Sequence, residues 1–146
     1  MYSVGSIILI KNIVFKNGNK CFDHAYKYGR PCLIISLLND NIYYVPLSSS
    51  FDFKKINESD IIISSKYCRK KSKISLKNIY FTDGYYYDEK EKFSDEDLLS
   101  ILKKLYKFQT SHISDSLFNV IMADIQNTIG ELSNRVNNTK KLVYKL

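Results

Sequence analysis

The hydrophobic pattern of the chain changes its period at Ser94, and this change constrains the fold more than any other feature. Before Ser94, short apolar runs bounded by turn residues are typical of β-strands. After it, apolar residues recur at the spacing of one face of an α-helix. We therefore expect an α+β protein in which residues 1–88 form mainly a small antiparallel β-barrel and residues 94–146 are mainly helical. A chain of 146 residues can bury one substantial core but is short for two, so we expect a single domain over residues 1–146.

The strand candidates are residues 4–10, 31–38, 42–47, 61–63 and 74–81. The second and third of these are joined by Asn39-Asp40-Asn41, a polar cluster that suits a tight turn. The sequence therefore predicts a hairpin here. Several short strands in succession favour a small closed barrel.

Two helices are predicted after the strands. Ser94 is a good N-cap, and the acidic residues Asp95, Glu96 and Asp97 suit the positive end of a helix dipole. A second start lies at Ser114-Asp115 and leads into one long apolar stripe, which Gly130 and Asn137-Asn138 weaken. The stripe comprises Leu117, Ile121, Ile125, Ile129, Leu132 and Val136. Core packing over the sheet is the favoured role for this stripe, and an oligomer seam is the alternative.

The charge of the chain favours an anionic partner such as nucleic acid or a membrane surface. The net charge is +7, and residues 1–88 hold 13 basic and 7 acidic residues. The alternative is that this charge only keeps the protein in solution. The N-terminus lacks a basic region before its apolar stretch, and no segment has the length of a membrane span, so we expect neither secretion nor membrane insertion. Cys21, Cys32 and Cys68 show no metal-ligand spacing and suit reduced thiols in the cytoplasm, so no metal and no cofactor are expected.

Two segments carry residue types that suit RNA. The long loop of residues 11–30 contains His24, which can exchange protons near neutral pH, together with basic side chains for phosphates and tyrosines for base stacking. Residues 66–73 contain five basic residues and one tyrosine, a composition that suits a phosphate track. Each segment has a plainer alternative, a solvated loop with no role in binding. The candidate RNA-binding residues are Tyr26, Lys27, Tyr28, Lys54, Lys66, Arg69, Lys70 and Lys71.

Three short motifs resemble the MazF/PemK and ToxN/CptN toxins. They are GSIILI at residues 5–10, GRPCLII at residues 29–35 and VPLSSS at residues 45–50. The resemblance implies an SH3-like antiparallel barrel of the Kid/MazF/CcdB type with added helices. It also implies that Arg30 is the catalytic basic residue and that Ser48 and Ser49 are the catalytic hydroxyl pair. Tyr26 matches an aromatic residue near the scissile phosphate in the ToxN group. Ser48 departs from the threonine common in the family but keeps the hydroxyl.

The resemblance implies a toxin endoribonuclease of a bacterial toxin-antitoxin system that needs no metal. In such a reaction the 2′-hydroxyl of the RNA attacks the adjacent phosphorus and leaves a 2′,3′-cyclic phosphate. His24 is the expected general acid or base on chemical grounds, with a surface histidine as the alternative. The added helices favour the type III group, whose inhibitor is a repeat of a small folded RNA pseudoknot, and a homo-oligomer or a toxin-RNA assembly is an expected outcome. The alternatives are a type II MazF/PemK toxin with a protein antitoxin, a non-catalytic RNA-binding module and a CcdB-like gyrase poison.

Overall fold

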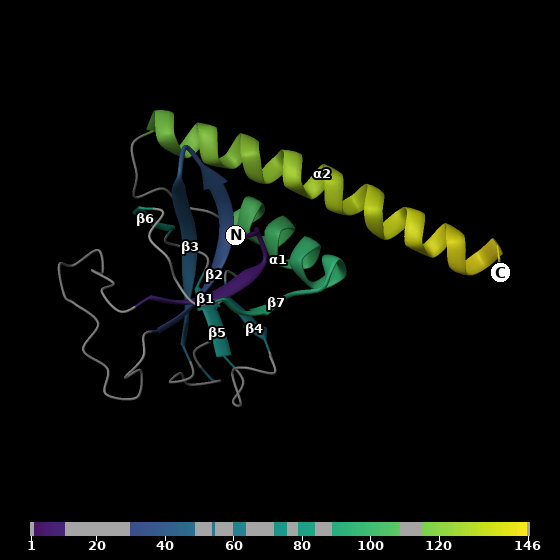
Figure 1. The fold of residues 1–146 in the computed structure, drawn as a ribbon, viewed down its shortest axis with the longest axis horizontal. Helices are drawn as coiled ribbons and strands as arrows, with labels where there is room; N and C mark the ends of the chain where they lie inside the picture. Colours follow the sequence, from purple (N-terminus) through teal and green to yellow (C-terminus); the bar gives the residue numbers. More distant parts are fainter. Residues whose placement is uncertain are drawn as a thin grey trace.

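A curled antiparallel half-barrel followed by two C-terminal helices forms the protein (Figure 1). The computed structural model describes residues 2–10, 30–48, 54, 60–63, 72–75, 79–83, 89–108 and 115–145. The strands are β1 (Ser6–Ile10), β2 (Arg30–Leu38), β3 (Asn41–Ser48), β4 (Asp60–Ile63), β5 (Ser72–Ser75), β6 (Tyr80–Asp83) and β7 (Glu89–Lys92). The α+β class, the antiparallel sheet and the C-terminal helices confirm the sequence prediction.

The sheet runs in the order β4-β5-β3-β2-β1-β7, and β6 also pairs with β3. Within the described residues the two end strands, β4 and β7, do not pair with each other, so the sheet is a half-barrel. Strand β3 has two partners along one edge, because residues 41–44 pair with β6 and residues 47–48 pair with β5. Pro46, which has no N–H for a ladder, lies beside this change of partner.

The predicted hairpin is confirmed. Leu38 lies opposite Asn41, and the two residues between them, Asn39 and Asp40, have φ values of 50° and 65°. Positive φ at both turn residues is the signature of the type I′ turn, whose twist matches that of the flanking strands. Asn and Asp are the non-glycine residues that enter this region most readily, so the sequence forms this turn without a glycine.

A β-bulge interrupts the β2–β3 pairing between Ile34 and Ser36. Ser36 lies opposite Tyr43, but Ile34 lies opposite Tyr44, so β2 holds one extra residue there. The bulge directs Ile35 and Ser36 to the same side of the sheet: Ile35 belongs to the main core, and the fully buried Ser36 hydroxyl donates to Asp124 Oδ2 at 2.5 Å. That hydrogen bond joins the sheet to the second helix.

The strands differ from the sequence expectation in two places. Residues 74–81 were expected as one strand, but β5 ends at Ser75 and β6 begins at Tyr80, and the two strands pair with different parts of β3. Strand β7, with the sequence EKEK, was not predicted because it has no apolar residue. It forms by pairing with β1 at the edge of the sheet, where a charged strand also discourages pairing with other chains.

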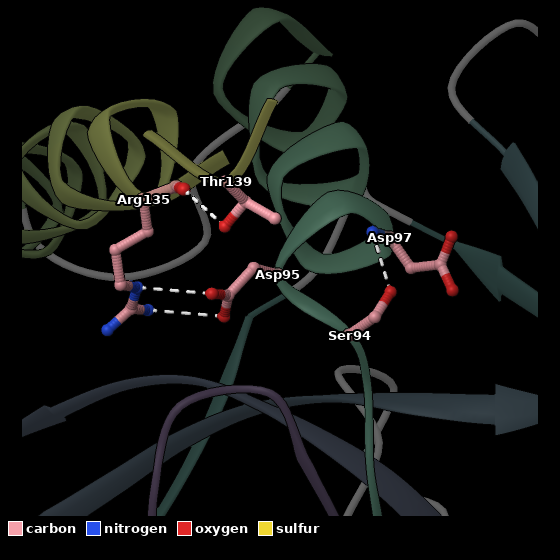
Figure 2. A network of polar contacts seen from close by, with 5 residues as sticks. All are labelled: Ser94, Asp95, Asp97, Arg135 and Thr139. Atoms are coloured by element: carbon pink, nitrogen blue, oxygen red, sulfur yellow. Dashed lines mark hydrogen bonds and ion pairs between the residues drawn. The ribbon is translucent and has the colours of Figure 1, made fainter. Parts of the chain in front are cut away.

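The helices are α1 (Asp95–Phe108) and α2 (Asp115–Lys145). The predicted N-cap is confirmed, because the Ser94 hydroxyl accepts a hydrogen bond from the N–H of Asp97 at 3.2 Å (Figure 2). Figure 2 also shows Arg135 of α2 against Asp95, with nitrogen–oxygen distances of 3.2 and 3.3 Å, so the first turn of α1 is joined to α2. Neither helix of the described chain has an apolar stretch of the length that a membrane-spanning helix requires.

Helix α2 is continuous through 31 residues, including Gly130 and Asn137-Asn138. Its apolar stripe packs in the main core as far as Leu132, as the favoured interpretation predicted, with Ile121, Ile125 and Leu132 fully buried. Arg135 still contacts Asp95 of α1, and the C-terminal end of the helix extends past the sheet and α1 (Figure 1). Gly130, Asn137 and Asn138 have low helix propensity, so we infer that packing of the preceding part of α2 in the core stabilises the helix.

The two faces of the sheet carry two different apolar clusters. The larger cluster joins strand residues such as Leu33, Val45 and Ile74 to the buried residues of both helices. The buried members of the smaller cluster all lie on strands, and none of its members comes from α1 or α2, the two helices of the described part of the chain. We call its side of the sheet the helix-free face. Its buried members are Ile8, Ile10, Cys32, Ile34, Ile42 and Tyr44. Strand alternation therefore divides each strand between a face that packs the helices and a face that does not.

Gly5 occupies a position that other residues fit poorly. Its φ is +95°, and an added Cβ would lie 2.8 Å from Cδ2 of Leu98 in α1. Its carbonyl accepts a hydrogen bond from the N–H of Phe93 at 3.0 Å, just before α1. The glycine thus lets the chain entering β1 approach α1 closely. Gly130 in α2 differs, because an added Cβ there meets nothing within 4 Å.

We predict opposite effects for alanine at these two glycines. Gly5→Ala should lower the free energy of unfolding by about 1–3 kcal/mol, because it combines positive φ with an overlap against Leu98. Gly130→Ala should raise it by about 0.5–1 kcal/mol, because alanine favours the helix and has room. Urea unfolding of both variants tests this, and an equal change of the same sign in both would contradict the assigned environments.

Candidate active site

Arg30, at the start of β2, and Ser48, at the end of β3, lie at the same end of the sheet. The paired residues of β2 and β3 end at Cys32 and Pro46, and this register continued by two residues along each strand places Arg30 opposite Ser48. The Nε–H of Arg30 donates a hydrogen bond to the carbonyl oxygen of Leu47 at 3.0 Å. That oxygen belongs to the peptide unit joining Leu47 to Ser48, so the guanidinium group is fixed beside the backbone of Ser48.

Local chemistry explains why the arginine side chain makes this bond. Pro31 follows Arg30 and has no N–H, so the start of β2 has one backbone hydrogen-bond donor fewer to offer to the neighbouring strands. The Arg30 side chain supplies a donor at this end of the ladder. The backbone of Arg30 is fixed as well, because the buried Cys32 thiol donates to its carbonyl at 3.3 Å.

Lys73 extends the pair to a row of three polar residues. It lies on β5 directly opposite Ser48, and β1 places Ile10 opposite Arg30 on the other side. Directly opposite residues share a face of the sheet, and Ile10 belongs to the smaller cluster. The row Arg30–Ser48–Lys73 therefore lies on the helix-free face. All three residues are partly exposed.

A buried carboxylate lies next to the row. Asp60 Oδ2 on β4 is 3.9 Å from Nζ of Lys73, and only 3% of the Asp60 side chain is exposed against 27% for Lys73. The Asp60 carbonyl accepts a hydrogen bond from Lys104 of α1 at 2.9 Å, which holds the start of β4 against the helix. The row with its neighbour thus holds two cations and one carboxylate, an arrangement with net positive charge.

Aromatic side chains occupy the same face further along β3. The rings of Tyr44 and Tyr80 stack with centroids 5.9 Å apart and planes 21° apart. Tyr44 is buried, whereas Tyr80 is partly exposed at the margin of the smaller cluster. Basic and aromatic side chains on one sheet face are residue types that can bind phosphates and stack on bases.

Of the residues predicted from sequence, the structure brings together Arg30 and Ser48. Lys54 is described and its side chain is exposed. The other candidates lie outside the described residues: Ser49, His24, Tyr26, Lys27, Tyr28, Lys66, Arg69, Lys70 and Lys71. Among the residues that are described, no cluster of three or more His, Cys, Asp or Glu side chains could hold a metal ion.

Lys73 and Asp60 were not predicted as site residues. Lys73 ends the basic run of residues 66–73, but its strand position was assigned to a loop. The available signal was its alternation with the buried Ile74. Asp60 directly precedes a run of three isoleucines, and its role depends on the β4–β5 register, which the sequence does not indicate.

No protein-family model matches the sequence, and no curated protein matches it significantly. The described residues define a class of site: three neighbouring strands, β2, β3 and β5, present a guanidinium, a hydroxyl and an ammonium group on the helix-free face. This is a site suited to an anion such as a phosphate diester.

We predict that Arg30→Ala lowers the free energy of unfolding by only about 1 kcal/mol, the usual contribution of one such hydrogen bond. Lys54→Ala, which removes an exposed side chain, should change it by less than about 0.5 kcal/mol. Urea unfolding at neutral pH measures both. A loss above about 3 kcal/mol in Arg30→Ala would mean that this residue is needed mainly for folding.

Proposed function

We propose that this protein is a cytoplasmic, toxin-type endoribonuclease that cleaves RNA without a metal ion. The observation that carries the proposal is the hydrogen bond from Arg30 to the carbonyl of Leu47, which fixes a guanidinium group beside Ser48 on the helix-free face. The basic character of residues 1–88 and the resemblance of three motifs to MazF/PemK and ToxN/CptN toxins support the same function.

In the proposed reaction the 2′-hydroxyl of the RNA attacks the adjacent phosphorus. Its proton goes to a base, the bond from phosphorus to the 5′-oxygen breaks, and that oxygen receives a proton from an acid. The products are a 2′,3′-cyclic phosphate and a free 5′-hydroxyl. Because the nucleophile belongs to the substrate, the protein has to supply orientation, charge stabilisation and proton transfer.

Each proposed residue has one of these tasks. The Nη groups of Arg30 bind the non-bridging oxygens, where negative charge grows as the phosphorus becomes five-coordinate. The hydroxyls of Ser48 and Ser49 donate hydrogen bonds to the same phosphate. His24 transfers a proton, and Tyr26 together with the partly exposed Tyr80 stacks on unpaired bases.

The proposed inhibitor is an RNA, as in the type III systems that the sequence resembles. A folded RNA offers many phosphates to a surface with net positive charge, whereas the protein antitoxin of a type II system would need an acidic inserted segment. The stacked tyrosines on the same face as the basic row favour a nucleic acid partner over gyrase binding. They suit a non-catalytic RNA-binding module equally well, and cleavage distinguishes that module from a nuclease.

We predict that the purified protein cleaves cellular RNA equally well with and without EDTA, leaving 2′,3′-cyclic phosphate ends. Arg30→Ala and Ser48→Ala should each lower the rate at least about 100-fold, as removal of a donor to a developing anion does. Arg30→Lys should retain part of the activity, because the charge remains but the two-pronged geometry is lost. Lys103→Ala, an exposed site on α1, is the control and should cleave normally.

Wild-type activity in Arg30→Ala or Ser48→Ala would sink the assignment of the site. Loss of cleavage in the wild-type protein after EDTA treatment would instead refute the metal-independent mechanism. Binding of RNA without any cleavage would favour the non-catalytic module.

We also predict that the rate at saturating RNA follows a titration near neutral pH, since an unperturbed histidine has a pKa of about 6.5. The titration should disappear in His24→Asn if His24 transfers the proton. Parallel pH profiles in the two proteins, less than about tenfold apart, would reduce His24 to a binding residue.

A further inference from the structure

We propose that Lys73 binds the RNA backbone at a phosphate next to the one held by Arg30 and Ser48, so that the strand crosses the sheet along the row Arg30–Ser48–Lys73. This inference rests on the proposed function. It adds the path of the RNA strand across the sheet and one RNA-binding residue. The observations that carry it are the pairing of Lys73 with Ser48 and the partial exposure of the lysine.

The geometry of the sheet sets the path. Neighbouring strands lie about 4.8 Å apart, so Arg30 on β2 and Lys73 on β5 are separated by roughly 10 Å across β3. A long lysine side chain on the same face reaches a second phosphate from there without competing for the first. On the far side of Arg30 the row continues to Ile10, which is buried and apolar. The polar part of the row therefore runs from Arg30 toward Lys73.

Asp60 gives Lys73 a defined position before RNA binds. Its carboxylate is almost completely buried and lies 3.9 Å from the ammonium group, a distance at which attraction restricts the lysine without a close hydrogen bond. The 27% exposed lysine side chain remains open to a ligand on its other side. Asp60 is in this view a positioning residue, and it partly offsets the repulsion between Lys73 and Arg30 in the protein without RNA.

The test is the salt dependence of binding to a short fluorescent 2′-O-methyl RNA, which cannot be cleaved. For a single strand, each lost phosphate contact lowers the slope of log K against log salt by about 0.7. Lys73→Met should show this change together with about tenfold weaker binding. Lys73→Arg keeps the charge and should keep the slope, and Lys103→Met is the matched control for the loss of one charge.

A second variant separates binding from folding. Lys73→Met removes the cation that lies 3.9 Å from the buried Asp60 carboxylate, and this change alone can destabilise the protein. The double variant Lys73→Met/Asp60→Asn removes that carboxylate charge and should recover stability in urea unfolding, yet it should still bind RNA as weakly as Lys73→Met. A double variant with wild-type affinity and wild-type slope would overturn the proposal.

Cleavage kinetics give an independent readout. A contact to a flanking phosphate is made equally in the ground state and the transition state, so Lys73→Met should raise KM with little change in kcat, whereas Arg30→Ala should lower kcat. Cleavage that does not depend on Lys73 in KM or kcat would refute the Lys73 proposal and leave the proposed function standing. If the wild-type protein binds RNA in a way that depends on Lys73 but cleaves none, the proposed function is refuted and the role of Lys73 in binding stands. Failure of the wild-type protein to bind the RNA would refute both.

Discussion

The register of the β2–β3 hairpin is the constraint on which the rest of the structure depends. Strand β2 pairs with β1 and β3, and β3 pairs with β2, β5 and β6, so these two strands connect most of the sheet. Their register starts at the turn of Asn39 and Asp40, whose positive φ values fix Leu38 opposite Asn41. Since side chains alternate between faces, a slip of one residue would exchange the core face with the helix-free face.

The bulge in β2 then decides which serine faces Arg30. The register of Leu38 and Asn41, continued without the extra residue, would bring Arg30 opposite Ser49, whereas the register of Cys32 and Pro46, continued by two residues, brings it opposite Ser48. The bulge also directs Ile35 to the same side as Ser36, into the larger cluster that contains the helix residues. One local irregularity therefore connects the packing of α2 on one face with the alignment of polar side chains on the other.

The two faces of the sheet have different roles: one packs the helices and stabilises the fold, and the other carries the proposed site. The helix-covered face holds the larger cluster, which contains the buried residues of α1 and α2. The helix-free face carries Arg30, Ser48 and Lys73 at one end and stacked tyrosines further along. Because Arg30 is partly exposed and belongs to neither apolar cluster, we expect its removal to affect ligand chemistry more than folding. Lys73 differs from Arg30, because it lies 3.9 Å from the buried Asp60 carboxylate and its removal is expected to affect stability as well.

The sequence by itself determined the features that depend on neighbouring residues. The change of hydrophobic period at Ser94, the tight turn after Leu38 and the serine cap of α1 all arise from local spacing and side-chain preference, and all are confirmed. The pairing of Arg30 with Ser48 was accessible only through motif resemblance, which could not choose between Ser48 and Ser49.

Tertiary structure alone decided the features that depend on partners distant in sequence. Strand β7 has no apolar residue and exists because β1 offers it a hydrogen-bonding edge. Residues 72–83 divide into two strands because β3 pairs with them at two different places. Lys73 reaches the row beside Ser48, and Asp60 reaches Lys73, through the registers of β5 and β4. Strand pairing joins residues far apart in the chain, and hydrophobic periodicity reports which face a residue occupies but not which residue lies opposite it.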